Sequence, residues 1–255
     1  FPYTTLFRSP SGNGRQIVSG IESCGPVTAL TLGLPSTTAV THPRGRLAKE
    51  RFYTNTSVDK RLQRHFIEDI DSITMLAVIR EQETGIPAGR TTREINVIGL
   101  EQSTNHPPLE VMEHIARTRD ELTRHRSRIL FVCVNGDMVR LAVFRNANVA
   151  EGLMEGSVHV GKPVEYGSAR LRLDGADLDA VWELLCAEII LGSPDPTRVD
   201  RRIVSRTRIM RLTKEVDQLE RRHAKTIQIG QRNKLWDELQ AKRHELEQER
   251  QGEAL

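Results

Sequence analysis

The longest apolar pattern in the chain predicts a β-hairpin. Two apolar and β-branched runs, Arg128–Val134 and Asp137–Phe144, flank the pair Asn135-Gly136. Asn-Gly tolerates the positive φ angles of a type I′ turn, so the two runs should be antiparallel neighbours. The first run is apolar throughout, which is typical of a central strand, whereas the second alternates and should have one wetter face.

A helical pattern precedes the hairpin. Thr56 is placed as an N-cap with Asp59 three residues later. Apolar residues then recur on one helical face, at Val58, Leu62, Phe66, Ile70 and Ile73. The run Ile73–Ile79 is either the end of this helix or a buried strand, and we favour the strand.

One further strand and two helices, with one or two additional strands, complete the expected domain. Glycine and proline predict a loop over Glu83–Arg93, and Ile95–Leu100 reads as a strand. Pro107 and Pro108 should open a helix, with Leu109, Met112, Ile115 and Ala116 facing inward. Asp174 should cap the last helix, whose inward face is Leu178, Val181, Trp182, Leu185 and Ile189. The segments Ser157–Tyr166 and Ala169–Leu173 can add one or two strands.

After Gly192–Pro196 the composition changes to Arg, Lys, Glu, Gln and Leu, with Thr197 and Asp200 as a capping pair. Apolar residues there follow the spacing of a coiled-coil seam, at Ile209, Leu212, Val216 and Leu219 and, out of phase, at Leu235, Leu239 and Leu246. One long helix with a stutter, or a hairpin that folds back near Thr226–Gln231, would fit this spacing. Because glycine disfavours a helix interior, Gly230 favours the hairpin, with an apolar edge left for a partner or a second copy of the chain.

These patterns predict an α/β (α+β) fold: a small mixed sheet with a central β-hairpin, about three packing helices, and a C-terminal helical coiled-coil arm. We expect the domain at 31–192, a linker at 193–197 and the arm at 198–251. Residues 1–30 should be artefact or disordered, because Phe1–Ser9 resembles a translated sequencing adapter and the first methionine is Met75.

Composition narrows the function classes only slightly. The net charge of +3 is far from the excess that announces a nucleic-acid protein. Cys24, Cys133 and Cys186 have no metal-ligand spacing and read as small buried hydrophobes of a reducing compartment. No apolar run reaches the roughly 18 residues of a membrane span. We therefore expect a cytoplasmic protein without a membrane partner.

No motif marks a catalytic, cofactor or metal site. Phosphate-loop spacings are missing from the sequence. Glu110 and His114 lie one helical turn apart, but a solvated helix face explains them better than a metal site. A metal-dependent nuclease remains the alternative function, with Glu94, Glu101 and Asp137 as acidic candidates.

A basic cluster opens the predicted arm. Arg201, Arg202, Arg206 and Arg208 lie here between Arg198 and Arg211. The four arginines could contact phosphate or a protein partner. We favour instead a solvated face whose arginines pair with Glu215 and Glu220 of the same arm, because no aromatic residues are interleaved for base stacking.

Short motifs along the chain resemble a bacterial family described as domain of unknown function 4391. They are Leu34-Pro35, Thr37–Val40, Leu47–Tyr53, the first helix, Glu94–Val97, Arg128–Val134, Asp177–Glu183, Gln231–Lys234 and Glu238-Leu239. The stretch Thr41–Arg46 departs from the family pattern. Members are similar in being encoded beside helicase-like and DNA-methyltransferase genes of restriction or defence clusters. The resemblance thus implies an accessory, non-catalytic subunit that associates with such a helicase or methyltransferase near DNA.

Overall fold

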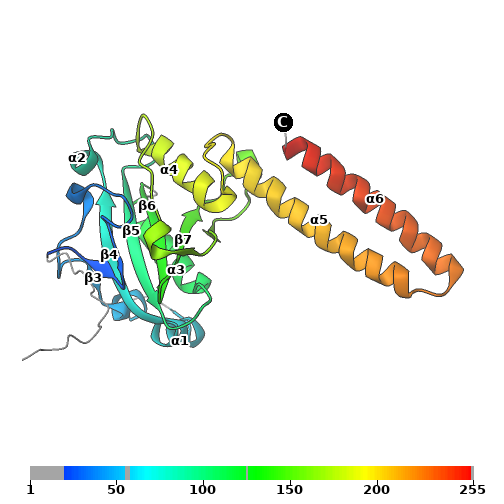
Figure 1. The fold of residues 1–255 in the computed structure, drawn as a ribbon, viewed down its shortest axis with the longest axis horizontal. Helices are drawn as coiled ribbons and strands as arrows, with labels where there is room; N and C mark the ends of the chain where they lie inside the picture. Colours follow the sequence, from blue (N-terminus) through cyan, green and yellow to red (C-terminus); the bar gives the residue numbers. More distant parts are fainter. Residues whose placement is uncertain (1–19, 55–57, 125, 254–255) are drawn as a thin grey trace, which may run out of the picture.

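The computed structural model describes residues 20–54, 58–124 and 126–253, and it shows a mixed α+β domain from which two long helices project (Figure 1). Seven strands form one sheet: β3 Arg46–Leu47, β4 Ile70–Ile79, β5 Glu94–Gln102, β6 Ser127–Asn135, β7 Met138–Arg145, β8 Ser157–Val160 and β9 Val164–Glu165. Their order is β3-β4-β5-β6-β7-β8, and β9 also pairs with β7. The sheet is therefore larger than the small sheet expected from the sequence.

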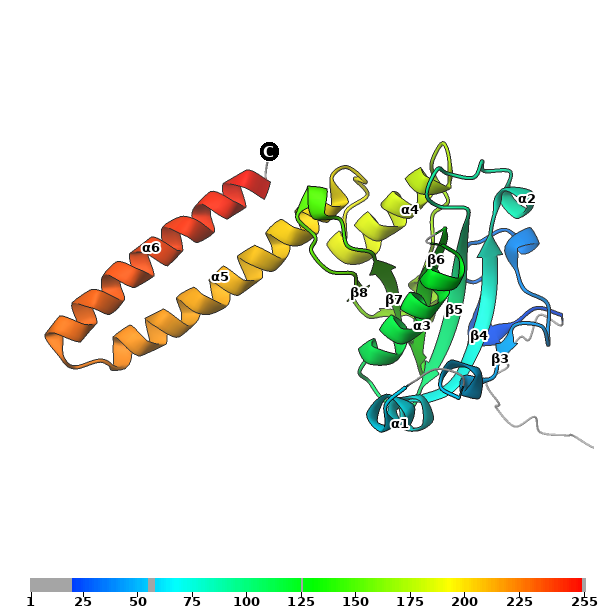
Figure 2. The same ribbon diagram turned by 180° about the vertical axis from the view of Figure 1, so that it is seen from behind.

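Among the strands that the structure describes, only β5 and β6 run parallel. The helix α3 Leu109–Leu122 makes the crossover between them and lies with α1 Lys60–Glu68 on one face of the sheet (Figure 2). The helix α4 Leu178–Cys186 covers the other face and continues as a π-helical turn, Ala187–Leu191. A one-turn helix, α2 Glu81–Thr84, and short 3-10 turns at Ser36–Thr38, Lys49–Phe52, Val149–Glu151 and Tyr166–Ser168 lie in the connections.

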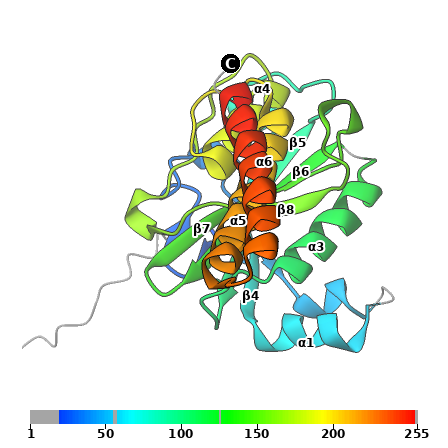
Figure 3. The same cartoon turned by 90° about the vertical axis from the view of Figure 1, so that its right-hand side faces the viewer.

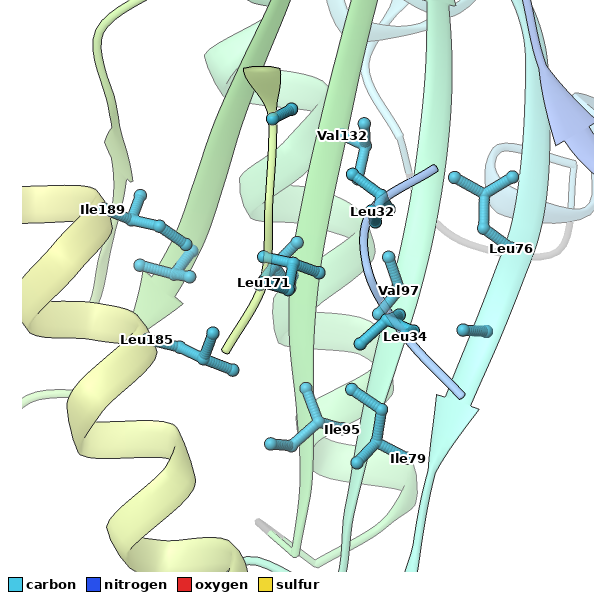
Figure 4. Packing of buried hydrophobic residues seen from close by; sticks show 14 of the residues in the cluster. Leu32, Leu34, Leu76, Ile79, Ile95, Val97, Val132, Leu171, Leu185 and Ile189 are labelled. Carbon is cyan, nitrogen blue, oxygen red and sulfur yellow. The ribbon is translucent and has the colours of Figure 1, made fainter. Parts of the chain in front are cut away.

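The strand β6 is buried on both faces, as its uniform apolar run predicts. Ile129, Phe131 and Cys133 pack toward α1 and α3, whereas Leu130, Val132 and Val134 pack toward α4. Figure 4 shows the layer on the α4 side, where Leu32, Leu34, Leu171, Leu185 and Ile189 meet side chains of β4, β5 and β6.

The expectation that residues 1–30 lie outside the fold is wrong for the part that the structure describes, which begins at Gly20. A two-stranded ribbon, β1 Ser23–Cys24 and β2 Val27–Thr28, packs on the sheet, and Cys24 and Val27 are fully buried. A Cβ atom on Gly99 would lie 2.5 Å from Cys24 Cβ, so this glycine allows the ribbon its close approach. The ribbon contributes side chains to the core, and this cannot be read from a segment without periodicity.

The strand that we favoured over Ile73–Ile79 is confirmed as part of β4, which starts three residues earlier than expected. Ile70 therefore belongs to β4 and not to the first helix, because Asp69 ends α1. Asp59 is the N-cap and accepts a hydrogen bond from Leu62 N; the predicted cap Thr56 lies outside the described residues. The loop predicted at Glu83–Arg93 starts inside α2.

Two other helix starts also differ from the sequence prediction. Asp177, not Asp174, caps α4 by accepting from Ala180 N, and Asp174 pairs with Arg172. Pro108 precedes α3 as expected, although Leu109 is exposed rather than inward-facing.

The hairpin is confirmed, but its turn is not the expected type. Asn135 pairs with Met138, so Gly136 and Asp137 are the two central residues. Gly136 has φ of 57°, while neither Asn135 nor Asp137 has a positive φ. Glycine at the first central position with the positive angle is the pattern of a type II′ turn, which needs only one left-handed residue.

The arm consists of α5 Val199–Lys225 and α6 Ile229–Glu253, which lie side by side and run in opposite directions (Figures 1 and 2). The chain reverses at Thr226–Gln228. Gly230 lies in the first turn of α6, not in the turn between the helices, and nothing would obstruct a Cβ atom there. Seen along the arm, α6 covers one side of α5 (Figure 3).

Candidate functional site: the helical arm

A buried network of ion pairs and hydrogen bonds joins the arm to the domain. Arg145, at the end of β7, donates through Nε to Asp200 Oδ1 at 3.0 Å and through Nη1 to Glu183 Oε1 at 2.7 Å. Asn148 Nδ2 donates to the other Asp200 oxygen at 2.7 Å. Because Arg145 and Asp200 are both almost fully buried, removing either would leave the other poorly compensated. The network therefore joins β7, α4 and α5 at the root of the arm.

The root network changes the expected role of Asp200. Thr197 and Asp200 do not form a capping pair: Thr197 Oγ1 donates to Asp195, and the helix begins after Arg198, which has φ of 49°. Burial would lower the pKa of the Arg145 guanidinium, but nearby Glu183 and Asp200 raise it above its usual value. Arg145 thus stays charged. The sequence carried no signal for this pair, whose members are 55 positions apart.

A polar cavity of about 200 Å³ lies beside this network, lined by Thr91, Arg145, Asn148, Asp179, Trp182 and Glu183 among others. This volume is below the roughly 300–1,000 Å³ typical of small-molecule sites. Asp179 fills one side of the cavity by accepting hydrogen bonds from Thr91 Oγ1 at 2.6 Å and Thr92 N at 2.7 Å. Burial raises the pKa of Asp179, but the hydrogen bonds from Thr91 and Thr92 outweigh it and lower the pKa overall. These hydrogen bonds join the loop that contains Thr91 and Thr92, called the Thr91 loop below, to α4.

The four arginines considered as a contact for phosphate or a protein partner all have partners within the chain. Arg201 Nε lies 2.5 Å from Glu151 Oε2, and Arg202 contacts the Asp195 carboxylate and its carbonyl. Arg206 donates to Ile190 O at 2.7 Å, and Arg208 pairs with Glu245 and Glu249. Arg211, the last arginine of the cluster, pairs with Glu215 as expected, and Lys242 contacts the same glutamate. Glu220 pairs instead with Arg243 of α6. The cluster fastens the arm to the domain and α5 to α6.

The seam residues also face inward. Leu212, Val216, Leu219, Leu235, Leu239 and Leu246 form one buried cluster, with Ile209 packed against it. The second helix that the seam requires thus comes from the same chain. Because these side chains bury one another, the seam has no apolar edge open to another molecule, although the sequence led us to expect one.

The acidic residues of the nuclease alternative do not converge. Glu94 and Glu101 lie at opposite ends of β5, about 23 Å apart along a strand of this length. Glu94 accepts from Ser127 and Arg119, and Glu101 accepts from Ser72. Asp137 lies in the hairpin turn.

The other metal candidates are engaged elsewhere. Glu110 pairs with Arg61, and His114 Nε2 lies 2.8 Å from Phe52 O. No group of three or more metal-binding side chains occurs among the described residues. The three cysteines are free and buried, as their apolar surroundings predict, and burial raises the pKa of the Cys133 and Cys186 thiols to about 12.

Exposed apolar residues lie at the far end of the arm, and no role was assigned to them from the sequence. We define the arm tip as residues 221–236; it comprises the turn and the adjoining helix ends. Ile227 is 94% exposed, Ile229 77% and Trp236 47%. These three fall outside the seam spacing, which is the signal that could have separated them from the core residues of the arm.

The family model described as Domain of unknown function (DUF4391) matches residues 32–246, most of the chain. The chain belongs to this family. No curated protein and no solved structure matches it. Family membership confirms the resemblance seen in the short motifs, and it attaches no activity to the arm. In the part of the chain that the structure describes, no helix is long and apolar enough to span a membrane.

Proposed function

We propose that this protein is a non-catalytic binding subunit in which the α/β domain is the base and the arm holds a contact surface away from it. A single observation carries the proposal: the arm buries its own seam, yet exposes Ile227, Ile229 and Trp236 at its far end. Exposed apolar side chains grouped at one place are typical of interaction sites.

The length of the arm supports this role. At about 1.5 Å per residue, the 27 residues of α5 place the arm tip about 40 Å from the root. In this proposal the helix pair acts as an intramolecular coiled coil, that is, a spacer closed by its own seam. The ion pairs at the root would keep the spacer fixed relative to the domain.

The wider setting is also a proposal. The apolar pattern and the cysteines led us to expect a cytoplasmic protein, and the resemblance implied an accessory subunit of a bacterial DNA-processing or defence assembly. In that setting the α/β domain would dock on a DNA-translocating or DNA-modifying enzyme, such as a helicase or a methyltransferase, and the arm tip would make a second contact.

Site-specific photocrosslinking in the native host tests the arm tip as a contact surface. Benzoylphenylalanine would replace Ile227 in one variant and Met210 in a matched control, because Met210 is also exposed, at 67%, but lies on α5 outside the tip. We expect crosslinks to another macromolecule from position 227 and few from position 210. Equal yields from both positions, or none from position 227, would contradict the proposal.

A further inference from the structure

The arm tip concentrates the positive charge of the chain. Residues 221–236 contain five cations, Arg221, Arg222, Lys225, Arg232 and Lys234, and no aspartate or glutamate. The whole chain has a net charge of +3, so everything outside this segment sums to −2 (3 − 5). The mild overall charge conceals a basic segment at the turn of the arm, which Glu220 precedes and Asp237 and Glu238 follow.

These five cations have no charged partner among the described residues. All five side chains are exposed, and none makes an ion pair or a side-chain hydrogen bond with the described residues. Closer to the domain more of the arm's cations are paired, although Lys214 and Arg250 are not within the described part of the chain: Arg208 contacts two glutamates, and Lys242 contacts Glu215 and Glu245. The contrast suggests a ligand outside the chain that supplies the missing negative charge.

The cations flank an apolar centre. Ile227 lies in the middle of the turn with Ile229 two residues later, while the five cations lie on the helix ends to either side. Trp236 packs on His223 across the two helices, with ring centroids 5.5 Å apart, and keeps about half of its surface exposed. The surface therefore offers charge at its edges and apolar contact between them.

Resting on the proposed role of the arm as a binding element, we propose that the arm tip binds nucleic acid whose bases are accessible, in a single strand or at a fork. The five cations contact phosphates. Ile227, Ile229 and Trp236 contact base faces, which a continuous duplex covers by stacking.

The composition of the tip favours nucleic acid over a protein partner. Five exposed cations that form no ion pair with the described residues suit a ligand with many closely spaced negative charges, and a phosphate backbone has this by its chemistry.

Binding to fluorescein-labelled DNA tests the proposal with the full chain. The probes are a 30-nucleotide single strand, a blunt 30-base-pair duplex and a fork with two unpaired arms, each titrated from 50 to 200 mM salt. We expect the strand and the fork to bind more tightly than the blunt duplex. If all five cations contact phosphate, the slope of log affinity against log salt should be about −3.5 for the single strand.

A charge-matched pair of variants separates the tip from general electrostatics. The tip variant changes Arg221, Arg222, Lys225, Arg232 and Lys234 to Gln; the control variant changes Arg51, Arg90, Arg93, Arg124 and Arg126 to Gln, all exposed on the domain. Both take the net charge from +3 to −2 (3 − 5). We expect the tip variant to lose at least about tenfold in affinity and most of the salt slope, and the control to lose little. Equal losses would overturn the proposal.

A separate measurement tests the apolar residues of the tip. Ile227→Ser with Ile229→Ser should remove the preference for the fork over the blunt duplex and keep most of the salt slope. Fluorescence of Trp236, the more exposed of the two tryptophans, should be quenched by the single strand. Binding to anionic vesicles but to no DNA probe, or an unchanged fork preference, would overturn the nucleic-acid inference. Crosslinks from position 227 to a protein would in that case still uphold the arm as a binding element.

Discussion

At the scale of single residues, the junction between the Thr91 loop and α4 depends on one carboxylate and one glycine. Asp179 accepts hydrogen bonds from Thr91 and Thr92, which lie 88 and 87 positions away. Gly89 leaves room for this contact, because a Cβ atom there would lie 2.4 Å from Asp179 Cγ and 2.7 Å from Asp179 N. A side chain at position 89 would push the loop away from α4.

Gly89→Ala should therefore destabilise the fold. We expect a loss of about 1–3 kcal/mol from overpacking, measured by urea denaturation. Gly167→Ala is the matched control, because nothing lies within 4 Å of its added Cβ atom, and its effect should stay within about 0.5 kcal/mol. An equal effect of the two substitutions would show that the close contact is not what matters at Gly89.

The Asp179 carboxylate also predicts that the stability of the fold depends on pH. Hydrogen bonds lower the pKa of Asp179 in the folded state, so its contribution to stability is full above the unfolded pKa of about 3.9 and is lost as the pH falls through the folded pKa. Asp179→Asn should be less stable than the wild type at pH 7, and the difference should shrink below pH 4. Urea midpoints across this range check the prediction, and a constant difference would contradict it.

At the scale of elements, the N-terminal ribbon and the arm differ in what holds them in place. The ribbon has two strands of two residues each and is held by burial of Cys24, Val27 and Ala29 against the sheet. The arm has long helices, each with most of its surface in water, and is held by its leucine seam and by ion pairs. The two elements should therefore respond differently to small changes.

Removal of the ribbon should be costly. A chain that begins at Thr31 should melt several degrees below one that begins at Gly20, because it exposes core surface that three fully buried side chains now cover. Thermal unfolding followed by circular dichroism compares the two chains. Equal melting temperatures would mean that the ribbon is not part of the cooperative core.

Gly230→Ala tests where the chain reverses. Gly230 is inside α6 without a positive φ and with open space for a Cβ atom, so alanine should stabilise the arm by about 0.5–1 kcal/mol. If the chain instead reversed at Gly230 through a left-handed residue, the same substitution would destabilise it. The sign of the change in the helical unfolding transition decides between the two positions.

At the scale of the whole molecule, the arm separates two kinds of surface. Seen from the side, the two helices lead away from the sheet and end in the turn between α5 and α6 (Figures 1 and 2). The root is neutralised by internal pairs, whereas the tip keeps five unpaired cations among the described residues. Association through the seam would require the hairpin to open.

We therefore expect the full chain to sediment as a monomer at micromolar concentration. The seam is already covered by the same molecule, and a second copy would meet a tip of like charge. Sedimentation velocity at 50 and 500 mM salt checks this. A dimer that Leu212→Ala or Leu239→Ala abolishes would show that the seam does pair between molecules.

The sequence by itself determined the elements whose signals are local. The hairpin follows from a period-two pattern around the Asn-Gly pair, and most helices follow from period-3.6 patterns. The arm follows from the change of composition after Gly192. Each of these signals depends only on neighbouring residues. Tertiary structure decided contacts between distant positions: Arg145 with Asp200, Asp179 with the Thr91 loop, and Cys24 beside Gly99. It also decided which arginines are free, because an arginine has the same sequence signature whether or not the fold brings a carboxylate within reach.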